Sequence, residues 1–262
     1  MGVLRIALLV CDAPPRQIYH RFGHYAVWFT QLFTASLGRV APHTHLALTA
    51  FNVKANEYPL SYTEFDGIVI TGSAANAYDD DPWIVNLVDY IKTFHTQAPD
   101  TCRMIGVCFG HQVIARAFGT KVEKNVKGWE AGWTEIEVTE ACRNVFETDK
   151  GKFTLQQMHQ DHVVSTPNGF QLLATTEKSS IQSLLFPNRI FTVQAHPEFY
   201  PELVGAVIKR RHKLGIFSDE FANNALANVG LKDDSPWFAD IMTKFLLRQH
   251  HATNTEPMYF KK

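Results

Sequence analysis

The sequence has few of the features that mark several large protein classes. Its 25 Lys and Arg residues are matched by 26 Asp and Glu residues, so no basic surplus points to nucleic acid or to an anionic membrane. The apolar run 3–10 is too short to cross a bilayer and has no cleavage-site flank. No internal repeat, low-complexity linker or Gly-rich nucleotide loop is present. These absences favour a soluble cytoplasmic protein with neither a nucleic-acid nor a membrane partner.

Cysteine is scarce and irregularly spaced, which argues against a disulfide framework. The four are Cys11, Cys102, Cys108 and Cys142. They form no Cys-x-x-Cys pair, and such usage is typical of a reducing compartment. The twelve His residues are scattered, and the pairs His43-x-His45 and His159-x-x-His162 lack further ligands at zinc spacing. We therefore expect no metal site.

The order of apolar runs predicts an α/β fold. Strands are expected at 3–10, 45–53, 66–72 and 103–108, and helices at 19–37 (closed by Gly38), 82–97 and 112–118. This alternation is typical of βαβ units in a mostly parallel sheet, whose ligands bind beyond the carboxyl ends of the strands. The loops 11–18, 71–81 and 108–112 should therefore meet at one rim.

The pattern changes after residue 120, where short runs with turn signals between them predict further strands. These strands are expected at 133–139, 153–159, 170–176, 181–186 and 190–195, and helices at 203–214, 218–229 and 235–249. The last helix carries an apolar stripe that core packing explains better than a partner groove. With 262 residues, 45% of them hydrophobic, the chain can bury a large core. We expect one domain over residues 1–215 and a helical C-terminal extension, 216–262, packed on it.

Residues 103–112 predict a strand, a sharp turn with Cys108 at its apex, and the start of a helix. The pattern Gly106-x-Cys108-x-Gly110 is the cysteine form of a nucleophile elbow. The flanking glycines would let strand and helix pack closely, and the helix N-terminus would favour a thiolate. A buried structural cysteine between two chance glycines is the alternative reading of these five residues alone.

The stretch Gln194-Ala195-His196-Pro197-Glu198 could supply a base for that thiol. His196 follows a predicted strand, and Pro197 turns the chain away from the sheet. Glu198 can then accept a hydrogen bond from Nδ1 of His196 and orient the ring. Taken alone, a capping Glu beside a bystander His would explain the motif as well.

These two motifs together resemble the class I (triad) glutamine amidotransferase family. The segments 70–83 and 157–163 resemble that family's oxyanion-strand loop and its substrate-side His-x-Asp segment, so the resemblance spans about residues 3–215. It implies a three-layer α/β sandwich with a mixed, mostly parallel, flavodoxin-like sheet. It also implies that Cys108 is the nucleophile, His196 the base and then acid, and Glu198 the residue that orients it.

The resemblance further implies an oxyanion hole and a glutamyl pocket. The hole would use backbone N–H groups of Phe109 and of the Gly72-Ser73 turn, although many members have a second Gly where Ser73 stands. The predicted pocket residues are Gln112, Met158, His159, Gln160 and Asp161. A plain helix-surface role for Gln112 and a satisfied strand-end role for His159 remain alternatives.

The implied reaction is hydrolysis of a γ-glutamyl amide through a thioester, which needs no cofactor. One hypothesis is a stand-alone hydrolase of γ-glutamyl peptides, such as glutathione or its conjugates, because the elbow, the 78–83 loop and the 128–133 segment resemble the γ-glutamyl peptidase-like branch. A second is a glutaminase subunit that delivers ammonia to a separate synthase, as in GMP synthase. A third is a non-catalytic binding protein on the same fold.

Overall fold

The computed structural model describes residues 2–247. Its strands are β1 (Gly2–Val10), β2 (Thr44–Asn52), β3 (Gly67–Ile70), β4 (Arg103–Val107), β5 (Val122–Lys124), β6 (Glu130–Val138), β7 (Lys152–His159), β8 (Asp161–Val163), β9 (Gln171–Thr175), β10 (Ser183–Phe186) and β11 (Ile190–Val193). Its α-helices are α1 (Arg16–Phe22), α2 (Tyr25–Val40), α3 (Pro82–Gln97), α4 (Phe109–Ala117), α5 (Glu140–Phe146), α6 (Pro201–Lys213), α7 (Asp219–Asn228) and α8 (Ser235–Leu247). Two 3-10 turns, η1 (Val53–Ala55) and η2 (Tyr62–Glu64), lie between β2 and β3.

One mixed sheet forms the centre of the molecule, in the order β2-β1-β3-β4-β11-β10-β9-β6-β7. The pairings from β2 to β11 are parallel, and those from β11 to β7 are antiparallel. The predicted mixed sheet is confirmed, with its parallel half built from the first half of the chain and β11. A separate pair, β5 with β8, lies outside this sheet.

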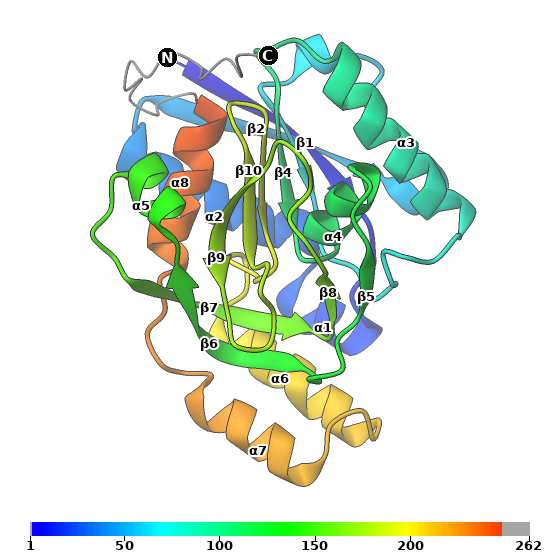
Figure 1. Ribbon diagram of the computed structural model, residues 1–262, viewed down its shortest axis with the longest axis vertical. Helices are drawn as coiled ribbons and strands as arrows, with labels where there is room; N and C mark the ends of the chain where they lie inside the picture. The colour runs from blue at the N-terminus through cyan, green and yellow to red at the C-terminus, as the bar shows by residue number, and fades with distance from the viewer. Residues whose placement is uncertain (1, 248–262) are drawn as a thin grey trace.

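Helices cover both faces of the sheet, with α2 and α8 on one face and α3 and α4 on the other (Figure 1). Successive side chains of a strand point to opposite faces of the sheet, so β1 contributes side chains to the core on both faces. Ile6 and Leu8 pack toward α2 and α8, whereas Ala7 and Leu9 pack toward α3 and α4. Figure 1 also shows α6 and α7 beneath β6 and β7.

The C-terminal helix α8 is part of the core. Phe238, Met242 and Phe245 are almost fully buried, as the apolar stripe predicts. The helix lies so close to β3 that a Cβ placed on Gly67 would be 2.5 Å from Leu246 Cδ2. The expected domain boundary at residue 215 stays a prediction, and residues 248–262 of the expected extension lie outside the described part of the chain.

The helix expected over 19–37 is instead two helices. Gly23, at φ 79°, ends α1, and α2 begins two residues later. Gly38 does not close α2, which continues to Val40. An interior Gly costs a helix only about 1 kcal/mol, and the burial of Leu37 and Phe33 on the same helix outweighs that cost.

None of the helices in the range 2–247 combines the length and the apolar character that a membrane crossing requires.

Candidate active site

The predicted elbow is present at the end of β4. Cys108 adopts φ 53° and ψ −103°, directly before the first residue of α4. Such a φ is strained for any residue with a side chain, and strain of this kind concentrates at functional sites. A Cβ on Gly106 would lie 2.6 Å from the Gly110 carbonyl, and one on Gly110 would lie 2.4 Å from the Ile70 carbonyl oxygen. Both glycines are therefore required for β3, β4 and α4 to pack this closely.

His196 is held beside the elbow by its backbone and by its ring. Its N–H donates to the Gln156 carbonyl at 2.9 Å, which joins the loop after β11 to β7. Its Nδ1 lies 2.8 Å from Glu198 Oε1. The Phe199 ring stacks on the imidazole with centroids 4.0 Å apart and planes within 5°. Because Nδ1 is engaged by Glu198, Nε2 is the nitrogen left to face the Cys108 sulfur.

The electrostatics of this cluster favour a protonated His196. Burial would lower the pKa of His196, but the charges of Cys108 and Glu198, with hydrogen bonds to both, raise it to about 10. All three side chains are almost completely buried. The arrangement therefore suits an imidazolium held between a thiolate and a carboxylate.

Gly72 brings a second loop to the same point. A Cβ placed on it would be 2.9 Å from His196 Cε1 and 3.7 Å from Cys108 Cβ. The N–H groups of Gly72, Ser73 and Phe109 donate no hydrogen bond to any residue between 2 and 247. Free N–H donors beside a nucleophile are the components of an oxyanion hole. The Ser73 hydroxyl accepts from the Ala75 N–H at 3.1 Å and so shapes the turn.

Asp12, which follows β1, stabilises the loop after β3 through hydrogen bonding, a role that the sequence did not reveal. Its Oδ2 accepts from the Ala74 N–H at 2.8 Å, and its Oδ1 pairs with Lys54 Nζ at 2.7 Å. A second tie joins the same loops, since the Cys11 N–H donates to Thr71 Oγ1 at 3.0 Å. The only sequence signal was the position of Asp12 two residues after the end of β1, at the predicted rim.

The predicted rim is thus assembled from neighbouring strands. Asp12, Gly72, Cys108 and His196 follow β1, β3, β4 and β11, which are consecutive in the parallel half of the sheet. Parallel strands end at the same edge, so residues far apart in the chain converge there.

Gln112 lies behind the elbow and is 3% exposed. Its Nε2 donates to the Asp161 carbonyl at 2.9 Å and to Gln194 Oε1 at 3.0 Å. The side-chain amide therefore ties α4 to β8 and to the chain that leads into His196. Only its carbonyl oxygen remains for a substrate, and its predicted pocket role stays a prediction.

The other predicted pocket residues lie along the end of β7. His159 is buried, with Nδ1 2.9 Å from the Asp161 carbonyl and Nε2 3.1 Å from Glu130 Oε2. Burial would raise the pKa of Glu130, but the hydrogen bond and charge of His159 lower it. Met158 is buried in the same core cluster as Cys108, whereas the Gln160 amide donates to the Asn125 carbonyl at 3.4 Å. The structure thus places the His159 ring between the Asp161 carbonyl and the Glu130 carboxylate, and the pocket roles of these residues stay predictions.

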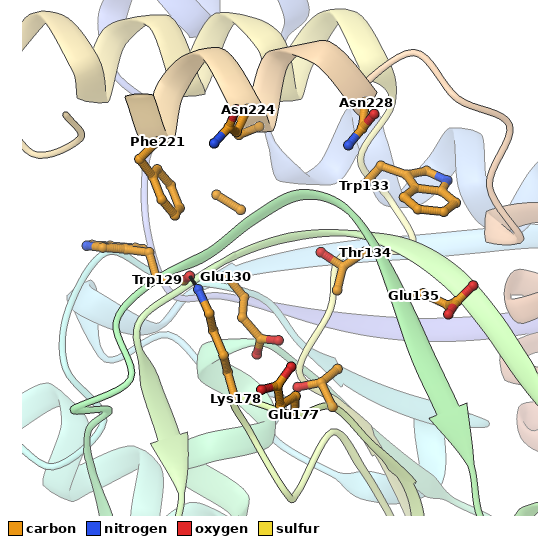
Figure 2. A pocket seen from close by; sticks show the side chains of 13 residues that line it. Trp129, Glu130, Trp133, Thr134, Glu135, Glu177, Lys178, Phe221, Asn224 and Asn228 are labelled. Atoms are coloured by element: carbon orange, nitrogen blue, oxygen red, sulfur yellow. Dashed lines mark hydrogen bonds between the residues drawn. The ribbon is translucent and has the colours of Figure 1, made fainter. Parts of the chain in front are cut away.

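A separate cavity of about 370 Å³ opens between β6, the 176–178 turn and α7 (Figure 2). Trp129 and Phe221 line one end of it, and Lys178 Nζ donates to the Trp129 carbonyl at 2.8 Å. None of Cys108, His196 and Glu198 lines this cavity.

Comparisons with known proteins agree with the fold and with the family resemblance of the sequence. The model of the family described as "Glutamine amidotransferase class-I" matches residues 30–213. A putative glutamine amidotransferase-like protein of Schizosaccharomyces pombe is 32% identical over 246 residues, which cover 92% of this chain and 98% of that protein. Gamma-glutamyl peptidase 5 of Arabidopsis thaliana is 28% identical over 86% of this chain and 88% of its own.

Two further similarities are more distant. One subunit of the glutamine-hydrolyzing GMP synthase of Sulfolobus acidocaldarius is 29% identical over 59% of this chain and 78% of its own. The crystal structure of a glutamine amidotransferase from Thermotoga maritima superposes with a TM-score of 0.64 at 16% identity, over 95% of this chain and 99% of that chain. This last similarity supports the fold alone.

Proposed function

The chain belongs to the class I glutamine amidotransferase family, and on that basis we propose that it hydrolyses γ-glutamyl amide bonds of peptides such as glutathione or its conjugates. The observation that carries the proposal is the placement of His196 between Glu198 and Cys108, with the Gly72 loop closing over the ring. The similarity to a γ-glutamyl peptidase over most of both chains supports a peptide as the substrate.

In the proposed reaction the Cys108 thiolate attacks the δ-carbonyl carbon of the γ-glutamyl group. The N–H groups of Gly72, Ser73 and Phe109 stabilise the oxyanion, and such donors are typically worth about 3 kcal/mol each. The tetrahedral intermediate collapses, the C–N bond breaks, and the imidazolium of His196 protonates the leaving amine. The product of this half-reaction is a γ-glutamyl thioester on Cys108.

The second half-reaction reverses the role of His196. Its now neutral ring takes a proton from water, the hydroxide attacks the thioester carbonyl, and the C–S bond breaks. Glutamate leaves, and the imidazolium and thiolate are restored. Glu198 keeps Nδ1 protonated throughout, so that Nε2 carries out both proton transfers. We propose the cytoplasm as the compartment, since all four cysteines are free thiols.

The purified protein, given glutathione and glutamine in separate reactions, tests the proposal. Release of cysteinylglycine and glutamate from glutathione, lost in Cys108→Ala, is the expected result. Hydrolysis that is unchanged in Cys108→Ala would instead mean that a contaminating enzyme produced the activity and that this protein is a non-catalytic binding protein.

A glutaminase subunit of a separate synthase is the second candidate, supported by the similarity to the GMP synthase of Sulfolobus acidocaldarius. Such a protein would release ammonia from glutamine and leave glutathione intact. Rapid cleavage of glutathione with little ammonia from glutamine would therefore exclude this alternative.

A further inference from the structure

Arg211, in the last turn of α6, has no partner for its charge within the described range. The side chain is partly buried, and it makes no hydrogen bond or ion pair with any residue from 2 to 247. Its guanidinium instead lies over the Trp129 ring, with Cζ 4.6 Å from the ring centroid. A partly buried guanidinium normally pairs with a carboxylate. Because Arg211 has no such partner among residues 2–247, its N–H donors are available to bind an anion from solution.

The Trp129 ring under Arg211 is held in place by its neighbours and lies beside the predicted glutamyl pocket. The Lys178 ammonium donates a hydrogen bond to the Trp129 carbonyl. The Phe217 ring packs against the Trp129 indole in an edge-to-face arrangement, with ring centroids 5.3 Å apart. The next two residues, Glu130 and Ala131, pair with His159 and Met158 across β6 and β7. Figure 2 shows Trp129 at the start of this strand, next to Glu130. Arg211 therefore lies over the start of the β6 segment that pairs with His159 and Met158.

The charge of Arg211 also reaches the nucleophile. Burial lowers the pKa of Arg211, whereas the negative charge of Cys108 raises it. Tyr25, at the start of α2, is among the other groups that affect it. These effects on the pKa agree with the position that the Trp129 contact and the β6–β7 pairing give the guanidinium.

Tyr25 is a second candidate donor, and it belongs to the core cluster that contains Cys108 and against which Trp129 packs. The residue is 9% exposed, and its hydroxyl makes no hydrogen bond with residues 2–247. A series of ring contacts links it to the site, from Tyr25 to Trp28 at 4.9 Å, from Trp28 to Phe199 at 5.8 Å, and from Phe199 to His196 at 4.0 Å. Burial, with the negative charges of Asp12, Glu198 and Cys108, raises the pKa of Tyr25 well above its usual value. The hydroxyl is therefore a permanent donor.

We propose that the Arg211 guanidinium and the Tyr25 hydroxyl form a carboxylate-binding subsite that anchors the substrate beside Cys108. This inference rests on the proposed function, since it names the part of a γ-glutamyl substrate that the site holds. The planar guanidinium matches a carboxylate in shape and charge. The α-carboxylate of a γ-glutamyl group lies only about 5 Å from the carbon that Cys108 attacks, because four bonds separate them. The terminal carboxylate of a peptide leaving group has the same chemistry.

The variant Arg211→Met tests the subsite, and Arg210→Met is the matched control. Arg210→Met removes a positive charge from the same helical turn but leaves the contact between Arg211 and Trp129 in place. Loss of a charge-assisted contact made equally in ground and transition states should raise KM about tenfold or more, with kcat within about threefold. Arg211→Lys should recover part of the loss, and Tyr25→Phe should raise KM less than Arg211→Met. Thermal melting of each variant establishes that it is folded.

Two substrates identify which carboxylate is held. Glutamine carries only the α-carboxylate, whereas glutathione also carries the terminal carboxylate of its leaving group. A higher KM for both substrates assigns the subsite to the α-carboxylate, and a higher KM for glutathione alone assigns it to the leaving group. An unchanged KM for both, or an equal rise in Arg210→Met, overturns the subsite.

A binding measurement separates this inference from the proposed function. Calorimetric titration of glutathione and glutamine into Cys108→Ala, with and without Arg211→Met, requires no turnover. Binding that weakens about tenfold without Arg211 supports the subsite even if the wild-type protein hydrolyses neither compound. Equal affinities, or no binding of either compound, overturn it even if hydrolysis is observed.

Discussion

Gly72 lies so close to His196 that a single methyl group between them would contact the imidazole at 2.9 Å. The loop after β3 therefore limits where the ring can lie, in addition to the Glu198 hydrogen bond and the Phe199 stack. The position and orientation of the His196 ring are thus limited by these three contacts, in addition to the backbone hydrogen bond to Gln156.

Gly72→Ala should lower kcat/KM by about a hundredfold or more, because either the ring or the oxyanion loop must move. Steady-state hydrolysis of the best γ-glutamyl substrate measures this. Gly38→Ala is the matched control, since Gly38 lies in α2 and a Cβ placed on it would meet no atom within 4 Å. That control should keep full activity and gain up to about 1 kcal/mol of stability. Full activity in Gly72→Ala would show that the ring position is not limiting.

Glu198→Gln should move the alkaline limb of the pH–activity profile to lower pH. The raised pKa of His196, about 10, depends partly on the Glu198 charge, so the neutral amide lowers it. The imidazolium that protonates the leaving amine is then lost at a lower pH. A profile of kcat/KM from about pH 6 to about pH 11 measures the shift. An alkaline limb that coincides with that of the wild type would contradict the assigned role of Glu198.

The same pKa shift predicts the pH dependence of stability. Because the folded protein binds the His196 proton more tightly than the unfolded chain does, this contribution is fully present below the ordinary pKa of 6.5 and is lost as the pH rises toward 10. Chemical unfolding at about pH 6 and about pH 9 should therefore show a loss of stability with rising pH. In Cys108→Ala, which removes one of the negative partners, the loss should be smaller.

Asp12→Asn should reduce kcat about tenfold with little change in KM, because the carboxylate positions the oxyanion loop without contacting substrate. The Ala74 N–H keeps an acceptor in the amide oxygen, but Lys54 loses its ion partner. Asp89→Asn, which removes an exposed ion pair with Lys92 on α3, provides the control and should retain full activity. A rise in KM without a fall in kcat would instead place Asp12 in the substrate pocket.

Gly110→Ala should destabilise the protein by about 3 kcal/mol, because its Cβ would lie 2.4 Å from a backbone oxygen of β3 that cannot move freely. Urea unfolding measures the change. Gly151→Ala, at a position where a Cβ meets nothing within 4 Å, should be close to neutral. Equal stabilities would mean that α4 can shift away from β3.

The elements with strong local signals were predictable from the sequence. The short apolar strands at the start of the chain, the helix that begins at Pro82, and the elbow around Cys108 all follow from residues within a few positions of one another. The break at Gly23 was missed because the apolar spacing continues across it, and the left-handed backbone of one glycine decides the boundary. Strands β5 and β8 and helix α5 are too short for a periodic pattern to develop.

The sequence by itself determined the residues that could do chemistry, because Cys108 with its two glycines and His196 with Glu198 each form a motif within five positions. Only the tertiary structure decided what these residues meet. Asp12 reaches the Ala74 N–H across 62 positions, and Gln112 reaches Gln194 across 82. Such contacts depend on the order in which parallel strands are placed in the sheet. Local spacing does not encode that order, since it is set by the packing of the whole core.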